Sequence, residues 1–169
     1  MTEIEQRIVA YIPRLRRYVQ ALIKGHHSMI EDLVQDCLER ALDRSHLFQQ
    51  GTDLRAWLFT IMHNVYANQI RRISNGPDFV ELPEIMDNSM ADTSTSKLEL
   101  RDLHQAISEL PLEQRQILLL VTLEGLPYQQ VADTLGIPVG TVMSKLSRTR
   151  QHLRKLTHRD DAPHLRRIR

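Results

Sequence analysis

Apolar residues recur at helical spacing along most of the chain, and no stretch shows a convincing strand pattern. The first run extends from Ile4 to Ile23 and stops at Gly25, a residue suited to a helix end. The second extends from Ile30 to Leu42 and the third from Leu54 to Val65. Three amphipathic helices of this kind predict a small bundle around a shared core. The expected N-terminal capping residues are Ser28 for the second helix, and Thr52 or Asp53 for the third.

A stretch without a sustained period separates this group from a second one. Residues 76–96 hold five acids, no bases and two prolines, which predicts a flexible acidic linker. Ser96-x-x-Glu99 then resembles a capping box. We expect helices from there to Leu110, over Leu112–Glu124 before Gly125, over Tyr128–Leu135 and over Val139–Leu156. The prediction is an all-α chain with two small helical domains, 1–75 and 97–158, and a tail at 159–169.

Composition excludes several classes of protein. The 169 residues include one cysteine, Cys37, so an internal disulfide and a Cys-rich zinc site are excluded. The eight histidines form no HExxH pair, and no Gly-rich phosphate loop occurs, so we expect no metal, no cofactor and no enzymatic activity. The longest apolar run, Ile117–Leu123, is too short for membrane insertion, and the mixed N-terminus is unlike a signal peptide. A cytoplasmic protein is expected.

Charge is distributed unevenly, although the net charge is only +1. Residues 76–113 hold 2 basic and 9 acidic residues, whereas residues 114–169 hold 10 basic and 4 acidic ones. Between Thr134 and Arg159 there are six basic residues and no acid. This basic stripe indicates one surface that faces nucleic acid, with a solvated helix face as the alternative.

The same segment has the spacing of a helix-turn-helix. Ala132 supplies the small residue where two helices approach, Gly136 the turn residue that tolerates a positive φ, and Val142 the apolar anchor of the second helix. Polar and basic side chains of the second helix would face a DNA groove. A plain helical hairpin with a polar face is the alternative. The outward side chains are Thr141, Ser144, Lys145, Ser147, Arg148 and Gln151.

Four motifs, in order, resemble those of the extracytoplasmic-function sigma factors, a short bacterial group of the sigma-70 family. The first half holds DLVQD at 32–36 and LRAWLFTI at 54–61. The second half holds LPLEQR at 110–115 and, from Gly125, GLPYQQVADTLGIPVGTVMSKLSRTR. The resemblance covers residues from about 8 to 157.

The resemblance implies core RNA polymerase as a partner, through the coiled-coil of its largest subunit and the flap of its second subunit. The contacts would be Asp32, Gln35 and Asp36. Their spacing of three and four residues places them on one helix face, which fits a basic partner helix. A solvated outer face is the alternative.

For the promoter −10 element, the resemblance implies a pocket that holds a single-stranded base. Stacking and edge hydrogen bonds hold such bases. Asn64 offers both a donor and an acceptor to a base edge. Arg71 and Arg72 would contact phosphates, or would only complement the helix dipole. The pocket residues would be Phe48, Gln49, Gln50, Gly51, Thr52 and Asn64, whereas Trp57 is expected in the core.

For the promoter −35 element, the resemblance implies readout by the second helix of the helix-turn-helix. The expected base contacts are Ser144, Lys145 and Arg148, with Thr141 and Arg150 nearer phosphates. The sequence departs from the family pattern at Met143, where relatives often have Arg. Methionine cannot donate to guanine but can touch a thymine methyl, so the preferred −35 sequence is expected to differ.

The expected function is therefore that of an alternative sigma factor, which directs core polymerase to promoters and assists melting. Twenty-one linker residues span up to about 70 Å, enough to bridge promoter elements that lie roughly 60 Å apart. Many relatives are held inactive by an anti-sigma protein, a further partner implied by the resemblance. Two alternatives stay open: a sigma-like decoy that binds an anti-sigma protein, and a helix-turn-helix repressor.

Overall fold

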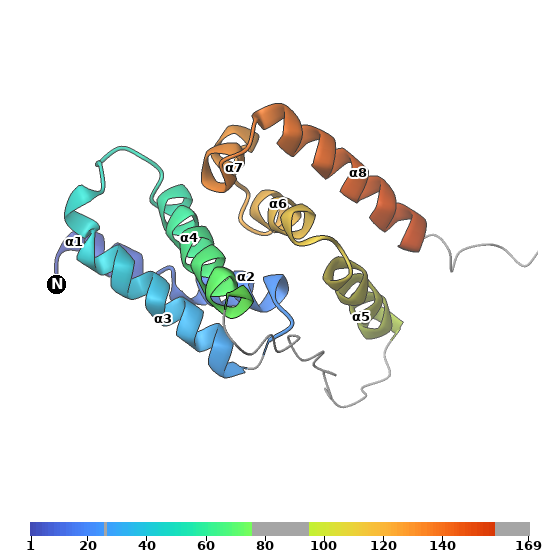
Figure 1. Ribbon diagram of the computed structural model, residues 1–169, viewed down its shortest axis with the longest axis horizontal. Coiled ribbons are helices and arrows are strands. Elements are labelled where there is room, and N and C mark those ends of the chain that lie inside the picture. Colours follow the sequence, from blue (N-terminus) through green and yellow to red (C-terminus); the bar gives the residue numbers. More distant parts are fainter. Residues whose placement is uncertain (26, 76–94, 158–169) are drawn as a thin grey trace, which may run out of the picture.

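The computed structural model describes residues 1–25, 27–75 and 95–157. In the first half, the third helix packs against the first, the second and the fourth (Figure 1). The elements of this half are α1 (Glu3–Val9), α2 (Ile12–Leu22), α3 (His27–Asp43), the 3-10 turn η1 (Ser45–Leu47) and α4 (Leu54–Ser74). Those of the second half are α5 (Thr95–Ser108), α6 (Leu112–Thr122), α7 (Tyr128–Leu135) and α8 (Val139–Thr157).

The run from Ile4 to Ile23 forms two helices and not the single one that its periodicity predicted. The N–H of Ala10 closes α1 by bonding to Gln6, and α2 begins two residues later with Pro13 in its first turn. Proline has no N–H for an intrahelical bond, and its ring would clash with the carbonyl four residues earlier, at Val9. The chain therefore breaks where proline can start a helix but not continue one.

The expected capping residues have mixed outcomes. Asp53 caps α4, because its carboxylate accepts hydrogen bonds from the N–H groups of Arg55 and Ala56 at 2.9 and 3.4 Å. Ser28 does not cap α3, which already begins at His27. Likewise α5 begins at Thr95, one residue before the predicted capping box, whose side chains lie outside the described residues. The linker over 76–94 and the tail over 158–169 also lie outside them.

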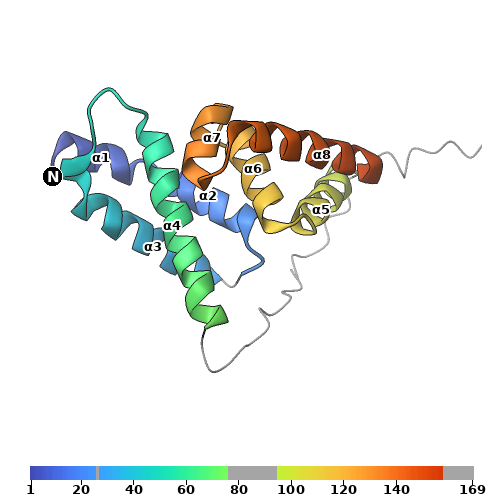
Figure 2. The same ribbon diagram turned by 45° about the horizontal axis from the view of Figure 1, so that its top comes forward.

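The two halves pack against each other through apolar side chains. Helix α7 lies against α4, and α6 lies against α2, as both ribbon views show (Figures 1 and 2). Leu58, Phe59 and Met62 of the first half and Ile117, Leu120 and Val131 of the second belong to one buried apolar cluster. Cys37 is fully buried in this cluster, whereas Trp57 is half-buried and packs against it.

Arg115, from the LPLEQR motif, ties three helix ends together. Its guanidinium donates to the carbonyls of Ile107, Ser108 and Leu110 around the α5–α6 turn, and to Leu22 at the end of α2 at 2.6 Å. Carbonyls at helix C-termini have no intrahelical partner, and the helix dipole makes them attractive to a cation. This part of the motif therefore has a structural role. None of the helices described is long and apolar enough to cross a membrane.

Candidate nucleic-acid interface

The turn between α7 and α8 has the geometry of a helix-turn-helix. Gly136 closes α7 in the left-handed region, at φ +67° and ψ +36°. Ala132 and Val142 are buried, with 2% and 0% of their surface exposed, where the two helices meet. The glycine of the turn, the small residue at the contact and the apolar anchor thus occupy the positions that the sequence predicted.

The outer face of α8 is polar and basic. Ser144 and Arg148 are exposed on it, as the sequence predicted, and so is Met143, half of whose surface is accessible. Arg150 is also exposed, whereas Thr141 is half-buried. Two residues that were not chosen as base contacts, Ser147 and Gln151, are exposed as well. The helical periodicity had already placed both residues on the outer face.

Lys145 lies on the side of α8 that turns towards α6. Its ammonium group pairs with the carboxylate of Glu113. One turn later, the Thr149 hydroxyl bonds to the carbonyl of Lys145 at 2.8 Å and to Gln114 Oε1 at 3.1 Å. In this structure Lys145 therefore helps to hold α8 on α6, and Ser144 and Arg148 are the more accessible candidates.

A hollow of about 320 Å³ lies between the start of α7 and the outer face of α8. Tyr128 lines it from α7, and Met143, Ser147, Arg150 and Gln151 line it from α8, together with Leu146 and Arg154. The hollow thus brings Tyr128 beside the DNA-facing candidates. Sequence reasoning missed Tyr128 because it precedes the turn, far along the chain from α8.

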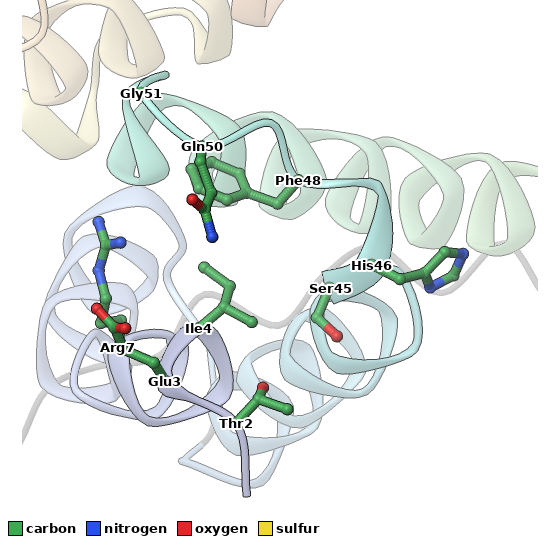
Figure 3. A pocket seen from close by; sticks show the side chains of 9 residues that line it. All are labelled: Thr2, Glu3, Ile4, Arg7, Ser45, His46, Phe48, Gln50 and Gly51. Atoms are coloured by element: carbon green, nitrogen blue, oxygen red, sulfur yellow. The ribbon is translucent and has the colours of Figure 1, made fainter.

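Three residues of the Phe48–Thr52 loop line one wall of a second hollow, of about 510 Å³: Phe48, Gln50 and Gly51 (Figure 3). The Thr52 hydroxyl donates to the carbonyl of Gln49 at 2.7 Å, and Gly51 has a φ of +92°, which favours glycine. The Phe48 ring packs 5.4 Å from that of Trp57. Gln50 is exposed, and its amide points into the hollow, as Figure 3 shows.

Helix α1 forms the opposite wall of this hollow. From α1, the Ile4 side chain points into the hollow towards Gln50, and Glu3 and Arg7 lie next to Ile4 (Figure 3). The hollow therefore has apolar surface from Ile4 and Phe48 and polar groups around it. Sequence reasoning missed α1, because more than forty residues separate it from the loop and no local pattern connects the two.

The remaining −10 candidates are spread along α4. Asn64 is exposed near the middle of the helix, and Arg71 and Arg72 are exposed in its last turn. A 21-residue helix is about 30 Å long. The structure therefore brings Phe48–Thr52 together but leaves Asn64 and the arginine pair at separate points along the same helix.

The acidic face predicted on α3 is present. Asp32, Gln35 and Asp36 are all exposed, and Gln35 Nε2 donates to Glu39 Oε1 at 2.9 Å. These three residues share a hollow of about 450 Å³ with polar residues of α4, among them Arg72. The structure thus places Arg72 beside the predicted polymerase-binding face. Asn68 and Gln69 also line this hollow and were not among the candidates.

The residues described contain no group of three or more His, Cys, Asp or Glu side chains that could hold a metal ion. The burial of Cys37 raises the pKa of its thiol to about 12, and its nearest polar partner is the carbonyl of Leu58. A thiol in this environment is a poor nucleophile. It therefore acts as a small apolar core residue.

Comparison with known proteins covers both halves of the chain. Residues 100–153 match the family described as Sigma-70, region 4, and residues 8–63 match the Sigma2 domain of PhyR. The ECF RNA polymerase sigma factor EcfG of Rhodopseudomonas palustris (strain TIE-1) is 35% identical over 161 residues, which cover 92% of this chain and 85% of that protein. The RNA polymerase sigma factor HrpL of Pseudomonas syringae pv. syringae is 29% identical, with 90% and 85% covered.

A solved structure also superposes on most of the chain. The sigma factor RpoE of Bartonella quintana, in complex with the anti-sigma factor NepR, is 31% identical and matches with a TM-score of 0.77. The superposition covers 92% of this chain and 97% of that one. The helical architecture of both halves is therefore shared.

Proposed function

The chain belongs to the extracytoplasmic-function sigma factors of the sigma-70 family and is an alternative sigma factor; we propose that it reads the −35 element with the outer face of α8 and the −10 element with the Phe48–Thr52 loop and α4. In this proposal α3 binds core RNA polymerase. The chain itself catalyses no reaction, because the polymerase carries out RNA synthesis. The proposal places it in the cytoplasm, where the polymerase acts.

The exposed polar face of α8 is the observation that carries the proposal. Arg148 and Ser144 are accessible on the second helix of a helix-turn-helix, the element that enters the major groove in such motifs. Arginine bonds to guanine edges with two donors, and serine bonds to either partner of a base pair. The side chain of Met143 adds an apolar contact suited to a thymine methyl.

The acidic face of α3 supports polymerase binding. Asp32 and Asp36 are exposed one turn apart, and a carboxylate pair of this kind complements basic side chains on a partner helix. Charge reversal at Asp36 (Asp36→Arg) is expected to weaken assembly with core polymerase. Asp43→Arg, at the exposed end of the same helix, is the matched control and should assemble normally.

Run-off transcription with purified chain and core polymerase tests the proposal. A pool of promoter sequences is used first to select a template, and transcripts must depend on added chain. Arg148→Ala should then weaken promoter binding about tenfold or more, because one good base contact contributes roughly 1–3 kcal/mol. Lys24→Ala, an exposed basic residue two positions after α2, is the control. Absence of chain-dependent transcripts with every template would refute the proposal.

A second candidate function is that of a sigma-like protein that binds an anti-sigma factor without starting transcription. The match of residues 8–63 to the Sigma2 domain of PhyR favours it, since the PhyRSL structure is a complex with NepR, which is named an anti-sigma factor. The same assay separates the two functions. A decoy would bind NepR-like partners, yet would support no transcript and would not bind core polymerase.

A further inference from the structure

A buried acidic residue of the second half faces three arginines of the first. Glu124 follows α6, and none of its side chain is exposed. Its carboxylate pairs with Arg14 Nε at 3.1 Å and lies 4.0 Å from Arg17, both on α2. Its backbone carbonyl accepts a hydrogen bond of 2.8 Å from Arg55 on α4. Glu124 is thus the centre of a polar cluster between the two halves.

Other polar contacts surround this cluster and join the same helices. The hydroxyls of Thr60 on α4 and Thr134 on α7 lie 3.1 Å apart. Gln116 of α6 lies 3.3 Å from the Nδ1 atom of His63 on α4. Arg115 donates to the carbonyl of Leu22. Together with the apolar packing of α7 on α4, these contacts hold the two halves in one arrangement (Figures 1 and 2).

We propose that this arrangement is an intramolecular closed state that cannot occupy a promoter, and that Glu124 with Arg14, Arg17 and Arg55 is the latch that holds it. We call this set of four residues the latch. The inference rests on the proposed function, since it concerns how the two DNA-reading surfaces are prevented from contacting the −10 and −35 elements at the same time. No second protein is needed for this inhibition.

The distance between the reading surfaces supports the proposal. Asn64 lies one helical turn after Thr60, whose hydroxyl contacts that of Thr134. Ser144 is ten residues beyond Thr134, and α8 begins at Val139. The path from Asn64 to Ser144 runs one turn along α4, across the threonine contact, along the chain from Thr134 to Val139 and then five residues into α8. Even with the chain between Thr134 and Val139 taken as fully extended, this path is no longer than about 40 Å. Promoter elements are separated by roughly 60 Å, so one closed chain cannot contact both.

The chemistry of the latch makes it releasable. A buried carboxylate loses its hydration, and the arginines offset this cost only while they stay in place. Arg14 and Arg17 are 38% and 57% exposed at their side chains, so they already contact water. When the halves separate, all four residues can be hydrated. A partner that binds only the open state can therefore shift the population towards that state.

A reversible covalent lock provides the first test. Thr60→Cys and Thr134→Cys together place two thiols where hydroxyls now lie 3.1 Å apart, within reach of a disulfide after a small shift. Cys37 does not interfere, because it is buried and burial raises the pKa of its thiol to about 12. The oxidised double variant is expected to give background levels of transcript with core polymerase. Reduction should restore the wild-type level, and each single variant should be insensitive to oxidant.

The outcomes of this test separate the two proposals. If the oxidised protein transcribes as well as the reduced one, the closed state is not inhibitory and the inference fails. If no disulfide forms under oxidising conditions, the halves do not meet as described and the inference also fails. If neither form nor the wild type supports transcription on any template, it is the proposed function that fails.

Neutralising Glu124 provides the second test, which reports on the latch itself. Fluorescent labels on cysteines at Gln20 and His152, exposed positions on α2 and α8, follow the separation of the halves by energy transfer. Glu124→Gln is expected to lower the transfer efficiency and to lower the apparent Kd of the holoenzyme for promoter DNA about threefold or more, since only the open state can contact both promoter elements and that Kd scales inversely with the open fraction. Glu109→Gln, an exposed glutamate directly after α5, is the matched control. Unchanged transfer in Glu124→Gln would overturn the role of the latch.

Discussion

Asp53 serves two structural purposes at a single residue. Its carboxylate caps α4, and its Oδ2 atom accepts a 3.0 Å bond from Arg55 Nη2, which orients that guanidinium towards Glu124. We expect Asp53→Ala to lower the free energy of unfolding by about 1 kcal/mol or more, the usual value of a lost cap. Asp53→Asn, which keeps the capping oxygen, should lose less. Urea denaturation of both variants measures the difference, and equal losses would contradict a capping role.

Met143 is the residue at which we expect promoter preference to be set differently from relatives. Half of its surface is exposed on the outer face of α8. Met143→Arg adds donors that favour a guanine edge and removes an apolar contact with thymine. The change should shift the preferred base at one −35 position, measured by comparing promoter pools selected by the two holoenzymes. Met143→Leu is the control, and an identical selection by the arginine variant would remove this assignment.

At the scale of elements, the turn between α7 and α8 depends on one backbone conformation. Gly136 has φ +67°, and an added Cβ would meet no atom within 4 Å, so only backbone strain opposes a side chain there. Gly136→Ala should destabilise the chain by about 1–2 kcal/mol. Gly140→Ala, with equally open surroundings in the first turn of α8, should be neutral or stabilising by up to about 1 kcal/mol. Thermal melts compare the two, and equal shifts would contradict the argument.

The helices themselves were largely predictable from the spacing of apolar residues, because each buries one stripe against a shared core. Helix α7 has the predicted bounds, and α8 differs from them by one residue at its end. The break between α1 and α2 was missed although Pro13 marked it, since the apolar period continues across the break. Lys145 shows the limit of this reasoning. The spacing of residues along α8 places it on the outer side, but that spacing cannot reveal that Glu113 approaches from α6.

At the scale of the molecule, the packing of the two halves was not predictable from the sequence. Arg55 and Glu124, which meet in the latch, are 69 positions apart, and Arg115 and Leu22 are 93 apart. Local periodicity assigns a buried face to each helix but does not say which helix covers it. The sequence therefore predicted two small helical domains, but not how they pack on each other.

The closed state is expected to depend on pH through His63, which lies at the contact between the halves. Burial lowers the pKa of His63 below its ordinary value of 6.5, so the closed state disfavours the imidazolium form. As pH falls through 6.5, an opened chain takes up a proton that the closed chain resists, and closure loses stability. Burial raises the pKa of Glu124 against the opposing pull of Arg14, Arg17 and Arg55, so its protonation at low pH acts in the opposite direction.

Replacing His63 separates these two contributions. His63→Gln keeps an amide near Gln116 but does not titrate, so it removes only the part of the pH dependence that comes from the imidazole. The energy-transfer pair at Gln20 and His152 should report more opening at pH 5.5 than at pH 7.5 in the wild-type background, and a smaller or reversed change in the variant. The same pH response in both proteins would show that the opening is controlled elsewhere, and that burial of His63 on α4, beside Gln116 of α6, does not bias the two states.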